Sequence, residues 1–433
     1  MSAAKDGFFR QSAWLAAATV LGGALMTAVH PVASQMGDTE YGVLGAMLRL
    51  FLLLGIPSGG LQVVFAQQSA AAVTPDLQRR LAGTARGVLC GIAVVWSALA
   101  VVTLVGSEAI ARRLNLTDAT VLWPTLAAAF TWLALPVFKG LLQGRQEFGT
   151  LGWIGILEGA GRLGAMAVVV LGFHGHAAGA MGAVVFGQAL SFVVALRATR
   201  SVWLAPGAET DWSGWIRRAV PYTAGAAGLL VLSLFDLVYL QATIPAAQAK
   251  AFSLGQLYLP AATIGFALTQ ITVPLAMVMF PKIARSVATG VKSDALALAL
   301  SGTALLGCCG WIAVLALPKL PLQILYFRTP ANWVAAPLVP WCVFAMLSYV
   351  LANVLVTDHL ARARFAVVPW VVAIAAAYVS VLVMLKPTLL AMDPLAAYRL
   401  VASVVGGANL SLLAIAAVLT WGRKRGRSTA GSP

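Results

Sequence analysis

Four charged side chains lie inside apolar stretches of this sequence: Arg49, Glu158, Arg162 and Asp236. An ionisable group at membrane depth costs several kcal/mol, so it usually faces a polar cavity or a partner. Guanidinium groups match phosphate oxygens in a bidentate geometry, which makes Arg49 and Arg162 candidate contacts for a diphosphate. The alternative for each arginine is a structural role, in which a partner buries its charge.

The spacing of the same charges suggests two further roles. Glu158 and Arg162 are four residues apart with the glutamate first, which favours a local ion pair on one helix. Arg49 and Asp236 lie at similar depth near the outer ends of spans in opposite halves of the chain. We therefore expect Asp236 and Glu158 to serve gating or coupling, with Arg49 approaching Asp236 when the protein is open to the cytoplasm. The alternative is that Arg49 and Asp236 each extend to the surface alone.

Uncharged polar residues within spans are candidates for sugar contacts, namely Gln62, Gln270 and Asn353. Such residues also join neighbouring helices, which is the alternative role. No glycine-rich loop with lysine and serine or threonine is present, so we expect neither an ATPase nor another enzyme, and no catalytic residue is assigned. His174 and His176 have no carboxylate or cysteine nearby in sequence, so we expect no metal site and no cofactor.

The composition predicts the kind of secondary structure in which these residues lie. The chain has 433 residues, of which 60% are hydrophobic and 10% charged, and its mean hydropathy is +0.88. These values exclude an ordinary soluble domain and predict an all-α polytopic membrane protein. About twelve transmembrane helices are expected, at residues 12–35, 43–66, 81–105, 119–141, 150–173, 177–199, 216–241, 251–280, 295–317, 333–357, 364–386 and 398–421.

The net charge of +15 would suggest nucleic acid in a soluble protein. Here the lysines and arginines lie mostly in short loops, so we expect the lipid bilayer and no nucleic acid as partner. With the N-terminus in the cytoplasm, 20 of the 29 lysines and arginines fall in cytoplasmic segments and 7 on the opposite side. This asymmetry predicts a multi-pass protein of the bacterial cell (inner) membrane with both termini cytoplasmic.

The longest of the cytoplasmic breaks, at residues 200–218, separates six spans from six. We therefore expect an N-terminal six-helix lobe at residues 1–205. A C-terminal six-helix lobe would occupy residues 206–433 and end in a short basic cytoplasmic tail. Two parallel bundles around a central cavity would suit alternating access.

Several motifs resemble one family of transporters. FKGLLQGRQEFG at residues 138–149 is followed by ILEGAGRLGAMAVV at 156–169, and LLGIPSGGLQVVFAQQ lies at 53–68. The C-terminal half adds LSLFDLVYLQA at 232–242, which contains Asp236, and MFPKIA at 279–284. This set is similar to the polysaccharide-export, or oligosaccharide flippase, branch of the multidrug/oligosaccharidyl-lipid/polysaccharide (MOP) flippase superfamily.

The resemblance implies a function that the composition alone does not. It implies a flippase that carries a lipid-linked oligosaccharide, usually on undecaprenyl diphosphate, from the cytoplasmic to the outer leaflet for cell-surface polysaccharide biosynthesis. Other polysaccharide-assembly proteins are implied as partners. Two alternatives stay open at this point: a drug or cation antiporter of the same superfamily, and a membrane-embedded glycosyltransferase or polysaccharide ligase. An antiporter would need acidic cavity residues, and a ligase would need a large outer loop or acidic cluster.

Overall fold

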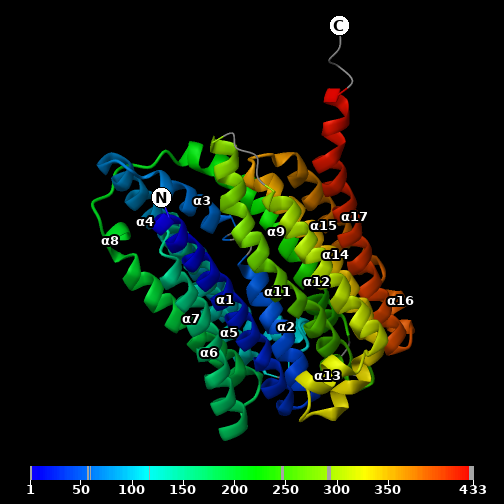
Figure 1. Ribbon diagram of the computed structural model, residues 1–433. Coiled ribbons are helices and arrows are strands. Elements are labelled where there is room, and N and C mark those ends of the chain that lie inside the picture. Colours follow the sequence, from blue (N-terminus) through cyan, green and yellow to red (C-terminus); the bar gives the residue numbers. More distant parts are fainter. Residues whose placement is uncertain are drawn as a thin grey trace. The chain divides into compact units, whose positions relative to one another are not determined.

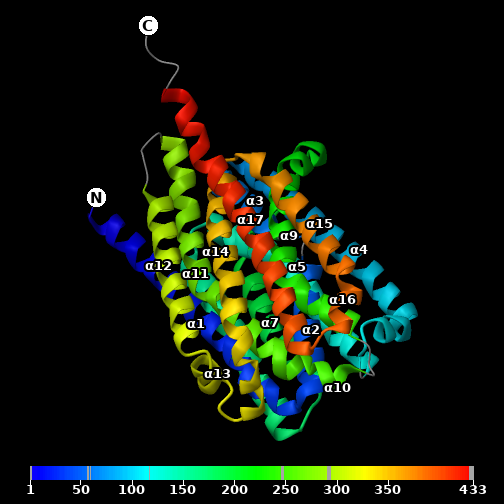
Figure 2. The same cartoon turned by 90° about the vertical axis from the view of Figure 1, so that its right-hand side faces the viewer.

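The computed structural model describes residues 2–55, 58, 60–116, 118–244, 248–289 and 294–428. Within these ranges, helices are the only regular secondary structure. The α-helices longer than one turn are α1 (Ser2–Ala33), α2 (Asp38–Leu54), α3 (Leu61–Ala71), α4 (Pro75–Arg113), α5 (Leu122–Gly144), α6 (Phe148–Ala167), α7 (Ala177–Ala198), α9 (Trp212–Thr243), α11 (Leu254–Thr289), α12 (Ala295–Ala316), α13 (Leu320–Leu325), α14 (Val339–Ala361), α15 (Val368–Met384), α16 (Lys386–Ala391) and α17 (Pro394–Ser428). Two α-helices are a single turn long, α8 (Arg200–Trp203) and α10 (Ala249–Phe252), and a 3-10 helix at Pro330–Leu338 directly precedes α14 (Figure 1 and Figure 2).

The predicted class, an all-α polytopic membrane protein, is confirmed. Crossing the hydrocarbon core takes about 20 apolar residues in a helix. Ten helical segments among the described residues are long and apolar enough, and they coincide with ten of the twelve predicted spans. A helix satisfies its backbone hydrogen bonds internally, which is why an apolar stretch of this length becomes a helix in lipid.

The two other predicted spans differ from a simple crossing. Span 43–66 is interrupted, because α2 ends at Leu54 and α3 begins at Leu61. The interruption coincides with the sequence GIPSGG at residues 55–60, and a Cβ on Gly55 would overlap the indole of Trp132 on α5. Span 251–280 corresponds to α11, of which Leu254–Thr269 is the apolar part identified in the structure.

The chain separates into two compact units. Unit 1 comprises Met1–Ala227 and Leu240–Ala249, and unit 2 comprises Gly228–Tyr239 and Lys250–Pro433. Helix α9 therefore contributes residues to both units. The predicted lobe boundary, between residues 205 and 206, stays a prediction.

Unit 1 contains three tightly packed helices, α1, α6 and α7, which lie side by side (Figure 1). Glycines permit this approach. A Cβ on Gly22 of α1 would lie 2.9 Å from the carbonyl oxygen of Gly155, and one on Gly187 of α7 would lie 2.6 Å from the backbone nitrogen of Arg162. Small residues at such contacts allow helix backbones in membranes to approach closely. The backbone of α7 thereby lies directly against the part of α6 that carries Glu158 and Arg162.

Unit 2 is organised around α14, which packs against α11, α12 and α17 (Figure 2). Polar side chains reinforce these contacts: the Asn409 side-chain amide of α17 donates to the carbonyl of Ala345 on α14, at 3.2 Å. Tyr398 of α17 donates to the carbonyl of Phe252, at 2.9 Å. Side-chain hydrogen bonds of this kind join helices where no water is available.

The orientation predicted from the basic residues can be tested by cysteine labelling. We expect single cysteines at Gly37 and His174 to react with a membrane-impermeant reagent from outside intact cells. A cysteine at Gly431, which lies outside the described residues, should react only after the membrane is opened. Labelling of Gly431 from outside would show that the predicted orientation is wrong.

Candidate functional site

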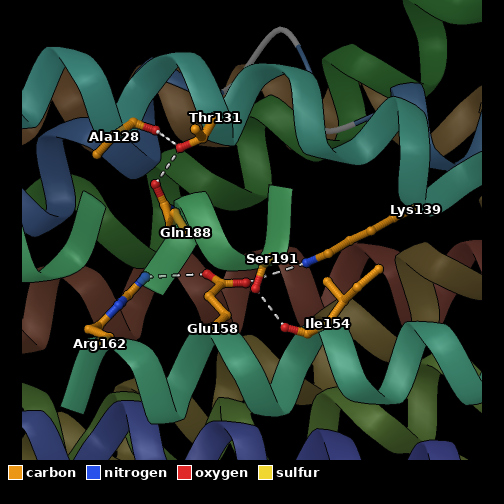
Figure 3. Close-up of polar contacts among 8 residues, drawn as sticks. All are labelled: Ala128, Thr131, Lys139, Ile154, Glu158, Arg162, Gln188 and Ser191. Atoms are coloured by element: carbon orange, nitrogen blue, oxygen red, sulfur yellow. Dashed lines mark hydrogen bonds and ion pairs between the residues drawn. The ribbon is translucent and has the colours of Figure 1, made fainter. Parts of the chain in front are cut away.

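The best-defined polar cluster of unit 1 is centred on Glu158, whose residue is only 1% exposed. One carboxylate oxygen, Oε1, lies 3.3 Å from Nη2 of Arg162. The other, Oε2, lies 3.6 Å from Nζ of Lys139 on α5. Figure 3 shows the two cations approaching the carboxylate from opposite directions. Glu158 is thus shared between Arg162 and Lys139.

Helix α6 determines the depth and direction of this cluster. Residues four apart lie on one face of a helix, so Glu158 and Arg162 project together, and their predicted ion pair is present. Glu158 follows Phe148 by ten residues, which corresponds to about 15 Å at about 1.5 Å per residue. That depth is close to the middle of a hydrocarbon core about 30 Å thick. A carboxylate at such a position needs compensating charge, and Lys139 and Arg162 supply it.

Uncharged polar groups surround the cluster (Figure 3). The Thr131 hydroxyl lies 2.7 Å from Oε1 of Gln188, which is fully buried on α7. The Ser191 hydroxyl donates to the carbonyl of Ile154 at 2.8 Å. One donor remains unused: Nε of Arg162 is buried without a hydrogen-bond partner among the described residues. Buried donors in proteins are usually satisfied, so this one favours a ligand that brings an acceptor oxygen.

Arg49 lies in the same unit, on α2, and is 8% exposed. Its positive charge and that of Arg162 both act electrostatically on His30 of α1. His30 in turn forms a 2.9 Å hydrogen bond between Nδ1 and the Tyr41 hydroxyl. The structure therefore brings both predicted diphosphate contacts close enough to act on the charge of one half-buried histidine.

The predicted coupling residue of unit 2, Asp236, is a buried carboxylate on α9. The Tyr258 hydroxyl donates to its Oδ2 at 2.5 Å, whereas Oδ1 has no hydrogen-bond partner among the described residues. Arg49 and Asp236 belong to different units, so their predicted approach to each other stays a prediction. Asp236 is thus a buried acid with one oxygen held by a neutral donor and one oxygen available.

The three predicted sugar contacts have different surroundings. Gln62 donates through Nε2 to Oε1 of Gln143 at 3.0 Å and so joins α3 to α5. Asn353 is half-buried on α14. The Gln270 side chain lies outside the described part of the structure. The sugar-binding role stays a prediction for all three.

Two residues of these clusters were not singled out from the sequence. Lys139 lies near the cytoplasmic end of the predicted span 119–141, and in the structure it belongs to α5 and pairs with Glu158. Its position inside the apolar run LALPVFKGLL was the available signal. Tyr258 could not have been assigned, because 22 residues separate it from Asp236 and no local pattern links them. In the described residues, no group of histidine, cysteine, aspartate or glutamate could hold a metal ion.

Solved structures with the same architecture were found, although no protein-family model matches the sequence. The search of curated proteins likewise found no significant match. The chain is similar to a MOP superfamily transporter from Pyrococcus furiosus, with a TM-score of 0.70, 11% identity and coverage of 98% of this chain and 96% of that chain. It is also similar to an inward-facing multidrug resistance transporter of the MATE family, with a TM-score of 0.67, 11% identity and coverage of 95% and 96%. A third similar structure is the lipid II flippase MurJ, with a TM-score of 0.68, 11% identity and coverage of 93% and 87%.

Proposed function

We propose that this multi-pass membrane protein, which has the fold of the MOP superfamily transporters, is a flippase for a lipid-linked oligosaccharide. The substrate would be carried on undecaprenyl diphosphate and moved from the cytoplasmic to the outer leaflet by alternating access. One observation carries the proposal: at the depth of the membrane centre, unit 1 holds a buried arginine with an unused donor. The lipid II flippase among the similar structures supports a lipid-linked substrate.

The charge of the site fits a diphosphate. Lys139 and Arg162 are positive and Glu158 is negative, so this cluster carries one net positive charge. A diphosphate diester carries one negative charge on each phosphate, so a phosphate bound here would offset that charge. Arg49, on α2 of the same unit, is the second proposed phosphate contact. Arginine suits this task because its planar fork can donate to two phosphate oxygens at once. A bound diphosphate would also compete with Glu158 for Arg162, which gives Glu158 the proposed gating role.

The antiporter alternative fits the charge of unit 1 less well. The MATE transporters among the similar structures share the fold, so the fold does not decide between the two functions. A cation substrate needs an acid whose charge is not already compensated, whereas Glu158 pairs with two cations. The proposed flippase instead uses the excess of positive charge. Asp236, with its available Oδ1, remains the proposed coupling residue in unit 2.

Deletion of the gene tests the proposed function. We expect the mutant to accumulate an undecaprenyl diphosphate-linked oligosaccharide that is accessible only from the cytoplasmic side, together with loss of the corresponding surface polysaccharide. Mass spectrometry of extracted lipids and of cytoplasmic-side enzymatic digests would measure this. Complementation with the wild-type gene should restore export. Normal polysaccharide with altered drug tolerance would contradict the flippase and support the antiporter.

A further inference from the structure

Lys139 points in an unusual direction for a lysine near the end of a span. It precedes Gly144, the last residue of α5, by five residues, or about 8 Å at about 1.5 Å per residue. Lysines in such positions usually extend their ammonium groups outward to water. Lys139 instead extends along α5 to Glu158, with its Nζ 3.6 Å from Oε2 (Figure 3).

A second ion pair shows what the same spacing does where, among the described residues, no other cation pairs with the acid. Directly after α14, Nε of Arg362 donates to both carboxylate oxygens of Asp358, at 2.9 and 3.0 Å. The Arg162–Glu158 pair also spans four residues, but only Nη2 and Oε1 meet, at 3.3 Å. Strong charge-assisted hydrogen bonds are about 2.7–2.9 Å long. Glu158 therefore holds Arg162 loosely, because its second oxygen is directed to Lys139.

The loose contact leaves a donor that a ligand could use. Nε of Arg162 is buried and has no partner among the described residues. The polar side chain of Gln188 lies close by, because Gly187, which precedes it, packs directly on the backbone of Arg162. A ligand group that binds Nε of Arg162 must bring an acceptor, and a negative charge would offset the excess of cations. A phosphate oxyanion has both properties.

We infer that Lys139 is a positioning residue, which neutralises Glu158 so that Arg162 can turn its donors to an oxyanion of the ligand. The inference rests on the proposed function and deepens it. When Arg162 engages a diphosphate, Glu158 keeps a partner in Lys139. Without Lys139, release of Arg162 would leave a buried carboxylate uncompensated, which is strongly unfavourable. Arg162 would then stay on Glu158, and the ligand would bind weakly.

Binding of farnesyl diphosphate to the purified full-length protein in lipid nanodiscs tests this inference. We expect Lys139→Met to raise the Kd by about tenfold or more. Lys139→Arg, which keeps the charge, should stay within about threefold of wild type. The double variant Lys139→Met, Glu158→Gln should recover to the same range, because the neutral amide that replaces the carboxylate no longer holds Arg162. Arg145→Met is the matched control, since it removes an exposed cation from the end of the same helix, where Arg145 pairs with Glu147.

The outcomes separate this inference from the proposed function. If the double variant binds as weakly as Lys139→Met, or if Lys139→Met binds like wild type, Lys139 does not act through Glu158 and the inference is overturned. The flippase proposal survives either result. If wild type binds farnesol as tightly as farnesyl diphosphate, or binds neither, the diphosphate site itself is wrong and both proposals fall. Melting temperatures measured on the same samples identify variants that have unfolded. If Lys139→Met is one of them, Lys139→Arg and the double variant test the inference: both must bind farnesyl diphosphate within about threefold of wild type, and weaker binding by either overturns it.

Discussion

Replacing Arg162 with alanine is expected to reduce polysaccharide export by about 100-fold or more, in line with the several kcal/mol that truncation of a buried, hydrogen-bonded charge typically costs. The replacement removes the guanidinium that faces Glu158 and would bind the diphosphate. Arg162→Lys should also fail, because an ammonium group cannot reproduce the planar fork. Export is measured as surface polysaccharide in the deletion strain carrying each variant, at equal protein level in the membrane.

A matched control is available in unit 2. Arg362→Ala breaks an arginine–acid pair of the same spacing at the C-terminal end of α14, so it reports the general cost of losing such a pair. We expect it to retain most of the export. Normal export by Arg162→Ala would exclude the binding role. Recovery of export in the Glu158→Ala, Arg162→Ala double variant would show that the pair is purely structural.

Replacing Asp236 with asparagine is expected to lower export by about tenfold or more while the protein still accumulates. Asparagine keeps an oxygen that can accept the Tyr258 hydrogen bond, so the packing of unit 2 should persist. What it removes is the ionisable oxygen, and with it the capacity to bind and release a proton or cation. Reconstitution into liposomes with and without an ion gradient would measure the coupling directly.

Two further variants define the origin of this effect. Asp294→Asn changes an exposed acid that makes no capping hydrogen bond before α12, and it should export normally. Tyr258→Phe leaves the carboxylate without its donor, which typically costs about 1–3 kcal/mol for a buried polar group. We expect it to be less stable and partly active. Full export by Asp236→Asn would show that the carboxylate charge plays no part in gating or coupling.

The helices and their approximate limits could be predicted from the amino-acid sequence alone. In a bilayer each spanning helix must satisfy its backbone hydrogen bonds internally, so length and apolarity are local properties that can be read directly. The same locality revealed the Glu158–Arg162 pair, because residues four apart on one helix are neighbours wherever that helix packs. Hydropathy missed the interruption between Leu54 and Leu61, since the residues between them carry no charge and long apolar runs flank them.

Which charged groups share a partner depends instead on how the helices pack in three dimensions. Lys139 reaches Glu158 because α5 and α6 pack at a particular rotation, and Tyr258 reaches Asp236 because α11 lies beside α9. Such contacts depend on where small residues such as Gly187 let helices approach, and hydropathy treats every apolar face alike. The direction of the Lys139 side chain likewise depends on how closely α5 and α6 approach each other. The bilayer determines that helices form, whereas side-chain packing between helices determines which buried groups meet.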